Sequence, residues 1–286
     1  MKTFNVGLIG MGTVGAGVAK ILLEKNSPLL EKLDCVPALK GIADSNPEVK
    51  SRLNLSSDVF FTHDAKALLN NPDIQVIVEL IGGVHPAKEI ILEALQKGKD
   101  VVTANKMLLA LHGAELFSQA RRYGKSISFE ASVGGGIPII AALRDGFIAN
   151  RIQSILGIVN GTTNYILTKM TKENVKYSDA LAEAQKMGYA EKDPTMDVEG
   201  IDSSHKLAIL AKIGFGADFD YERIYHEGIS NVEVSDIWYA YELGYTLKLV
   251  AIAKKAENMI ELRVHPTLLP HDHPLSSVNG VFNAIC

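Results

Sequence analysis

The strongest candidates for functional residues in this chain are a lysine and three acids in its second half. Asp202 and Lys206 stand four positions apart beside an apolar helical pattern over 207–213, so both lie near the start of one helix face. Glu191 and Asp197 precede them in a loop, where acids are good ligands for an ammonium group. An amine at the border of an apolar stripe is suited to proton transfer. An ordinary helix-surface salt bridge, worth about 0.3–0.5 kcal/mol, explains the pair equally well.

A glycine turn near the N-terminus points to a second kind of chemistry. Residues 10–15, GMGTVG, match G-x-G-x-x-G between a strand-like run over 6–9 and a helical pattern over 14–23. Such glycines permit a tight turn, close approach of the backbone to a pyrophosphate, and close packing of the helix on the strand. The pattern predicts a dinucleotide site, and the alternative is a glycine-rich turn without a ligand. The expected site residues are Gly10, Gly12, Thr13, Val14 and Gly15.

Two further positions are candidates for cofactor contact. Asp44 ends a strand-like run and can accept a hydrogen bond from a ribose 2′-OH, which would favour NAD. Lys50 and Arg52 follow and could contact a 2′-phosphate instead, so the choice between NAD and NADP stays open. Thr103 and Lys106 stand at the carboxyl end of another strand-like run, where open parallel sheets bind ligands. A lysine there can orient a carboxylate or a carbonyl, but a surface lysine opening a helix fits the same position.

The elements that must position these groups divide the chain into two domains. Strand-like and helical patterns alternate over 1–133, which predicts an α/β domain with a doubly wound parallel sheet of the Rossmann type. The expected strands are 4–9, 36–43, 59–62, 74–80, 100–103 and 126–130, and the expected helices are 14–23, 87–97 and 107–123. A triple-glycine break at 134–136 begins an α+β substrate and dimerisation domain over 134–286. Its expected helices are 139–147, one opened by Asn160, 177–187 and 203–213 with Asp202 as cap, and its expected strands are 152–159, 245–255 and 260–267.

Composition narrows the class of protein. The 286 residues include 29 Lys and Arg against 33 Asp and Glu, a net charge of −4, which argues against a nucleic-acid partner. The two cysteines, Cys35 and Cys286, cannot form a disulfide framework, and Cys35 is expected in the core. The N-terminal residues leave no room for a signal peptide, and the apolar stretch 133–143 is too short to span a bilayer. We therefore expect a cytoplasmic protein without a membrane partner.

Several motifs together resemble the homoserine dehydrogenase family. They follow the family order over essentially the whole chain, and in combination they are highly specific. They are the glycine turn, TANK at 103–106, EASVGGGIP at 130–138, NGTTN at 160–164, GYAEKDPT at 188–195, and DVEGID at 197–202 with Lys206.

The resemblance implies NAD(P)-dependent interconversion of L-homoserine and L-aspartate 4-semialdehyde, on the route to threonine, methionine and isoleucine. It implies that Lys206 handles the hydroxyl proton and that Lys106 also contacts the substrate, which Glu191, Asp197 and Asp202 hold mainly through its ammonium group. It further implies a homodimer or homotetramer whose dimer sheet includes the last residues. A monovalent cation, Na⁺ or K⁺, is implied among Glu130, Val133, Gly135 and Ile137.

The chain departs from the family pattern at its end. Family members continue past a segment like 277–283 into a glycine-rich stretch, and many add an ACT domain, whereas this sequence stops at Cys286. The expectation is thus a C-terminally short member without an ACT domain. Two other interpretations stay open: another small-acid dehydrogenase, and a non-catalytic dinucleotide-binding protein of the same fold. A semialdehyde dehydrogenase is disfavoured because it would need an exposed nucleophilic cysteine.

Overall fold

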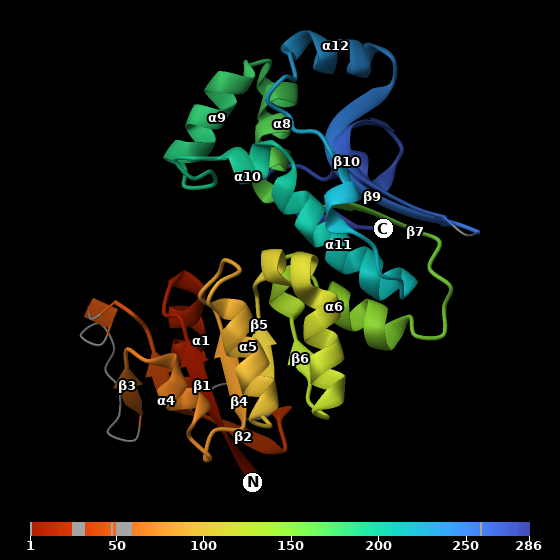
Figure 1. Cartoon of the computed structure of the whole chain (residues 1–286). Helices are drawn as coiled ribbons and strands as arrows, with labels where there is room; N and C mark the ends of the chain where they lie inside the picture. The colour runs from red at the N-terminus through yellow and green to blue at the C-terminus, as the bar shows by residue number, and fades with distance from the viewer. Residues whose placement is uncertain (1, 25–31, 47, 50–58, 258) are drawn as a thin grey trace. The chain divides into compact units, whose positions relative to one another are not determined.

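The chain folds into two compact units, each with its own sheet. The computed structural model describes residues 2–24, 32–46, 48–49, 59–257 and 259–286. Unit 1 is Met1–Ser132 and unit 2 is Val133–Cys286 (Figure 1).

Unit 1 is built on a parallel sheet with the strand order β3-β2-β1-β4-β5-β6. Its strands are β1 (Lys2–Ile9), β2 (Cys35–Ala43), β3 (Phe60–Thr62), β4 (Val76–Glu79), β5 (Asp100–Thr103) and β6 (Ile127–Ser128). Its helices are α1 (Thr13–Leu23), α4 (Ala65–Leu69), α5 (Ala87–Gln96), α6 (Lys106–Arg122) and the 3₁₀ turn η1 (Glu130–Ser132). The predicted α/β fold with a Rossmann-type sheet is confirmed. Because the strand order reverses between β1 and β4, the carboxyl ends of these two strands mark the expected ligand side.

The strands of unit 1 form because they are apolar on both faces. Leu8, Ile42 and Ile77 are completely buried in the three central strands, as expected where helices cover both sides of a parallel sheet. Helix α4 was not predicted from the sequence, and two further details differ from the prediction. Strand β6 is shorter than expected because the chain turns into η1, and Cys35, expected in the core, is only partly buried at the start of β2.

Unit 2 contains a mixed sheet with the order β11-β7-β9-β10-β8. Its strands are β7 (Ser154–Ile158), β8 (Tyr225–His226), β9 (Tyr245–Ala256), β10 (Met259–Pro270) and β11 (Ala284–Ile285). The long hairpin of β9 and β10 is the centre of this sheet, and β10 pairs with β8 in parallel while the other pairs are antiparallel. Helices α8, α11 and α12 pack against β9.

The helices of unit 2 carry most of the differences from the sequence prediction. They are α7 (Ile139–Ala141), the π-helical turn η2 (Ala142–Gly146), α8 (Gly161–Glu173), α9 (Tyr177–Lys186), α10 (Thr195–Val198), α11 (Ile201–Phe215), η3 (Tyr221–Arg223), α12 (Val234–Glu242) and η4 (Pro274–Ser277). Helix α10 forms where a loop was expected, and α12 was not predicted. Helix α11 begins two residues earlier than expected, after a left-handed Gly200.

None of the helices within the described ranges is both long enough and apolar enough to cross a membrane.

Candidate functional site

The glycine turn of unit 1 has the geometry of a phosphate cradle. Gly10 has a φ of +95°, and a Cβ added there would lie 2.7 Å from the carbonyl carbon of Leu80, so a larger residue is excluded. A Cβ on Gly15 would lie 2.0 Å from the Gly10 oxygen, whereas one on Gly12 would meet nothing within 4 Å. The third glycine is therefore needed for packing, and the second opens onto free space.

The N-terminus of α1 is open to an anion. Gly12 occupies the N-cap position without a side-chain cap, and the first turn of the helix, which begins with Thr13 and Val14, carries no acid. The first backbone N–H groups of a helix have no partner within the helix, and the helix dipole favours negative charge there. The residues present thus fit the pyrophosphate of a dinucleotide.

Asp44 lies beside this turn. Its Oδ2 accepts a hydrogen bond from the Met11 N–H at 2.6 Å, and its Oδ1 accepts one from the Asn46 N–H at 2.8 Å. A cavity of about 430 Å³ in unit 1 is lined by both the glycine turn and Asp44, together with His63. The structure thus brings together the glycines and the acid predicted from sequence. Lys50 and Arg52, the alternative cofactor contacts, lie outside the described residues.

A buried acid that the sequence analysis missed supports the neighbouring strand ends. Glu79, the last residue of β4, has no exposed surface. Its Oε1 accepts from the Ile81 N–H at 2.8 Å, and its Oε2 accepts from the Thr103 hydroxyl at 2.7 Å. A buried carboxylate therefore accepts a hydrogen bond from Thr103, the predicted cofactor contact. The signal was present as an acid directly after the apolar run 76–78.

The same network fixes the start of α6. The Thr103 hydroxyl accepts from the Asn105 N–H at 3.0 Å, and the Asn105 amide donates to the Gly83 carbonyl at 2.6 Å. Asn105 also caps α6, whose first residue is the half-buried Lys106. The carboxyl ends of β4 and β5 are thus joined to Lys106 by hydrogen bonds within unit 1.

In unit 2 the predicted lysine and two of the three acids form one cluster. Lys206 Nζ donates to Asp202 Oδ2 at 2.6 Å and to the Val159 carbonyl at 2.6 Å. The amide of Asn160 donates to Asp197 Oδ1 at 2.7 Å and to Asp202 Oδ2 at 2.9 Å. This cluster, Val159–Asn160 with Asp197, Asp202 and Lys206, is called the acid–lysine cluster below.

Two expectations about these acids were wrong. Asp202 does not cap α11: it lies inside the first turn, because Gly200 takes the cap position and frees the carboxylate to face Lys206 and Asn160. Asp197 lies in the short helix α10 and not in a loop.

Glu191 makes none of the hydrogen bonds given above for the acid–lysine cluster. It is exposed in the loop before α10. Its carbonyl accepts a hydrogen bond from Gln185 at 3.0 Å.

The four residues predicted to surround a cation belong to both units. Glu130 lies in η1 of unit 1, while Val133, Gly135 and Ile137 belong to unit 2. Gly135 has a φ of +60°, and a Cβ there would meet nothing within 4 Å. Within the described part of the chain, no group of three or more His, Cys, Asp or Glu side chains could hold a metal ion.

Lys248 is a second buried group that the sequence analysis missed. It lies in β9 with 1% of its surface exposed. Its Nζ donates to the Val278 carbonyl at 2.6 Å, to Asn164 Oδ1 at 3.1 Å and to Asn279 Oδ1 at 3.2 Å. Asn164 in turn donates to the Phe282 carbonyl at 3.2 Å. The lysine thus fastens the segment 278–282 to α8, and the signal was a lysine inside the apolar run 247–253.

Replacing Lys248 with methionine is expected to change how stability depends on pH. Burial, with a smaller contribution from Lys172, lowers the pKa of Lys248 to about 8. Between this value and about 10.4 in the unfolded chain, only the unfolded state holds the proton, so wild-type stability gains as the pH rises through this window. From about pH 7 to 9.5 the wild type should gain about 2 kcal/mol relative to the variant. Urea unfolding at both pH values measures this difference, and parallel curves would contradict it.

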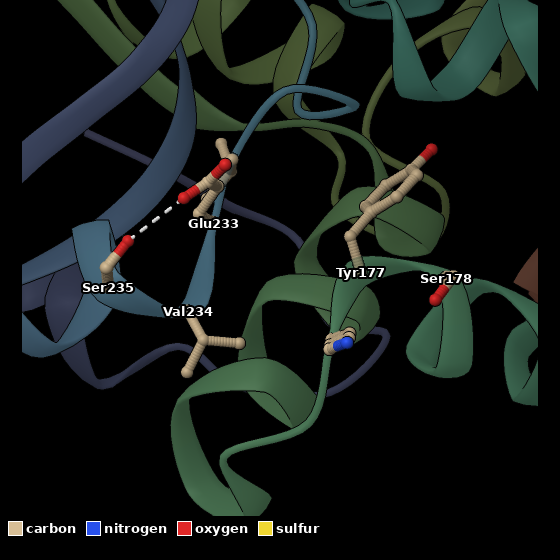
Figure 2. Close-up of a pocket in the computed structure, with 7 residues that line it drawn as sticks. Tyr177, Ser178, Glu233, Val234 and Ser235 are labelled. Carbon is tan, nitrogen blue, oxygen red and sulfur yellow. Dashed lines mark hydrogen bonds between the residues drawn. The ribbon is translucent and has the colours of Figure 1, made fainter.

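A further cavity lies away from all these groups. It has a volume of about 440 Å³ and lies in unit 2 between the start of α9 and the segment before α12. Figure 2 shows Tyr177 and Ser178 on one side of it, and Glu233 accepting a hydrogen bond from Ser235 on the other. No residue of the predicted site lines it.

Comparison with known proteins gives one consistent result. A family model described as "Homoserine dehydrogenase" matches residues 138–286, and one described as "Homoserine dehydrogenase, NAD binding domain" matches residues 10–130. Homoserine dehydrogenase of Bacillus subtilis (strain 168) is 46% identical over 285 residues, which cover 100% of this chain and 66% of that protein. The chain thus spans just under two thirds of the length of curated relatives that it matches.

Solved structures agree with the sequence comparison. A homoserine dehydrogenase from Thiobacillus denitrificans superposes with a TM-score of 0.94 at 45% identity, covering 99% of this chain and 65% of that one. A hyperthermophilic archaeal homoserine dehydrogenase in complex with NADPH gives a TM-score of 0.82 at 29% identity, covering 99% of this chain and 87% of that one.

Proposed function

Because the chain belongs to the homoserine dehydrogenase family, we propose that it catalyses the reversible oxidation of L-homoserine to L-aspartate 4-semialdehyde with NAD or NADP. The observation that carries the proposal is the acid–lysine cluster, in which one ammonium is held between a carboxylate and a backbone carbonyl. The reaction belongs to the biosynthesis of threonine, methionine and isoleucine.

Lys206 is proposed to exchange the hydroxyl proton. Oxidation of the alcohol removes a hydride from C4 and a proton from its oxygen, and the C–O single bond becomes a carbonyl. A bound nicotinamide cofactor supplies the hydride acceptor. The chain must supply the group that takes the proton, and Lys206 Nζ, which lies 2.6 Å from Asp202 Oδ2, is the proposed acceptor. In the reverse direction the ammonium returns that proton to the forming alkoxide.

The remaining charged groups are proposed to hold the two ends of the substrate. L-Homoserine carries one ammonium and one carboxylate, which call for partners of opposite sign. Asp197, Asp202 and Glu191 are the proposed partners of the ammonium, and Lys106 is the proposed partner of a carboxylate or carbonyl oxygen. Residues 10–15, Asp44 and Thr103 are the proposed cofactor contacts.

A direct assay tests the proposal. The purified chain is incubated with L-homoserine and either NAD or NADP, and formation of the reduced nicotinamide is followed by absorbance. L-Serine, which is shorter by one CH₂ group, is the matched control substrate and should be turned over at least about tenfold more slowly. Cofactor binding without turnover of L-homoserine would contradict the proposal and favour a non-catalytic dinucleotide-binding protein.

Replacing Asp44 with asparagine is expected to shift cofactor preference toward NADP. A carboxylate beside the adenosine ribose accepts a hydrogen bond from the 2′-OH and repels a 2′-phosphate, so loss of its charge removes the repulsion. The ratio of kcat/KM for NADP to that for NAD should rise about tenfold. Asp64→Asn, which alters the cap of α4 in the same unit, is the control of equal charge change. An unchanged ratio would exclude Asp44 from the ribose site.

We also propose a monovalent cation and a homo-oligomer. Glu130 and the carbonyls of Val133, Gly135 and Ile137 offer hard oxygen ligands to Na⁺ or K⁺, and activity measured in choline, sodium and potassium salts tests this.

Self-association is supported by exposed large side chains on and after α12, where Trp238 is 55% and Leu243 is 70% exposed. Light scattering of the purified chain measures its oligomeric state. A cytoplasmic location fits the two free cysteines and is tested by cell fractionation.

A further inference from the structure

Asn160 donates hydrogen bonds to two acids of the acid–lysine cluster, whereas its sequence pattern indicates only that it opens a helix. It lies two residues after the end of β7, is 4% exposed, and occupies the N-cap position of α8. Its side chain meets two different sets of partners, one on α8 and one among the acids. Both sets lie within unit 2, so the arrangement does not depend on the other unit.

The oxygen of the Asn160 side chain is fully used in capping the helix. Oδ1 accepts from the Thr163 N–H at 2.9 Å and from the Thr163 hydroxyl at 3.0 Å. These two donors fix the orientation of the amide, because a flipped amide would direct its N–H groups at the Thr163 N–H and its oxygen at two carboxylates. The amide nitrogen must therefore face the acids.

The nitrogen divides its two hydrogens between the acids. Nδ2 donates to Asp197 Oδ1 at 2.7 Å and to Asp202 Oδ2 at 2.9 Å. The same Asp202 oxygen accepts from Lys206 at 2.6 Å. Two carboxylates that approach one another repel unless donors lie between them, and a neutral amide provides two donors without adding a competing charge.

The backbone beside Asn160 completes the arrangement. The carbonyl of the preceding residue, Val159, accepts the second hydrogen bond of Lys206 at 2.6 Å. One turn of chain between β7 and α8 therefore presents a carbonyl to the lysine and an amide to both acids. A shift of this turn would displace the carbonyl and the amide together.

We infer that Asn160 is a positioning residue of the active site. Its amide bridges Asp197 and Asp202, and it thereby sets where these acids meet the substrate ammonium and where the Lys206 amine meets the substrate hydroxyl. The inference rests on the proposed function. It concerns a residue that touches the acids and the helix and not the reacting atoms. Its cap and its bridge are made by different atoms, so substitution can separate them.

Two variants distinguish the bridge from the cap. Asn160→Ser keeps a good N-cap oxygen but is too short to reach either acid, whereas Asn160→Ala loses both the cap and the bridge. The KM for L-homoserine should rise and kcat/KM should fall by about 10–100-fold in both variants, with the KM for the cofactor unchanged within about twofold. The melting temperature should fall further in the alanine variant than in the serine variant, because only the alanine variant also loses the helix cap. A serine variant with wild-type kinetics would overturn the inference, because the cap alone would then explain Asn160.

A spectroscopic measurement decides the bridge without any turnover. In ¹⁵N-labelled protein both side-chain amide protons of Asn160 should exchange slowly with solvent, and their signal should shift in Asp197→Asn and in Asp202→Asn. Rapid exchange, or a signal that neither variant moves, would overturn the inference. A wild-type chain that does not oxidise L-homoserine would refute the proposed function instead, and the amide signal would still decide whether the bridge exists.

Discussion

Lys206→Ala is expected to lower kcat for L-homoserine oxidation by about a thousandfold while cofactor affinity stays within about twofold of wild type. The amine is the group that takes the hydroxyl proton in the proposed reaction, and water in its place is a poorly positioned acceptor. Stopped-flow and steady-state rates with L-homoserine measure the loss, and fluorescence titration of the reduced cofactor measures its binding.

The chain offers a matched control for this experiment. Lys212 lies on the same helix, α11, and pairs with Asp218. Lys212→Ala removes an equal charge and should leave kcat within about twofold of wild type, since exposed ion pairs contribute little. Equal losses in both variants would assign the effect to the helix and not to proton transfer. Retention of activity in Lys206→Ala would remove the lysine from the mechanism.

Gly12→Asp is expected to weaken cofactor binding by about a hundredfold without harming the fold. The N-cap position has a φ of −65° and a ψ of −164°, which other residues adopt freely, and an added Cβ meets nothing within 4 Å. An aspartate there can accept hydrogen bonds from the first turn of α1, which should stabilise the protein by about 0.5 kcal/mol. The same carboxylate would occupy and repel the site proposed for the pyrophosphate.

The opposite signs of these two effects make the experiment decisive. Thermal unfolding measures stability, and calorimetric titration of NAD and NADP measures binding. Gly12→Asn is the neutral control: it should keep most of the added stability and lose less than about tenfold in affinity. Undiminished binding in Gly12→Asp would show that the phosphates do not lie at this helix end.

The fold and part of the site could be predicted because local patterns determine them. The apolar runs of unit 1 predict strands that are buried on both faces of a parallel sheet, and the structure gives a steric reason for two of the three glycines, Gly10 and Gly15. The pairing of Asp202 with Lys206 followed from helix periodicity alone, and the 2.6 Å distance confirms it. The predicted fold and family are likewise confirmed.

Long-range contacts account for what could not be predicted. Glu79 meets Thr103, and Lys248 meets Asn164, across separations in sequence that no periodicity connects. The error at Asp202 has a local cause: the left-handed Gly200 starts α11 two residues early, so the acid is not the cap and instead accepts hydrogen bonds from Lys206 and Asn160. For Asn160 the helix cap was recognisable in sequence, but its second set of partners depends on where α10 and α11 fold.

Of the two hydrogen bonds described for Lys206 Nζ, one goes to the main chain, at the carbonyl of Val159. No side-chain replacement at position 159 removes this acceptor. A scan by point substitution would therefore detect the hydrogen bond of Lys206 to Asp202 and miss the one to the Val159 carbonyl. Semisynthesis with an ester in place of the 159–160 amide would expose it, because an ester carbonyl is a weaker acceptor. Because the acceptor is a main-chain atom, a substitution of the buried Val159 that leaves the backbone in place retains this contact with Lys206.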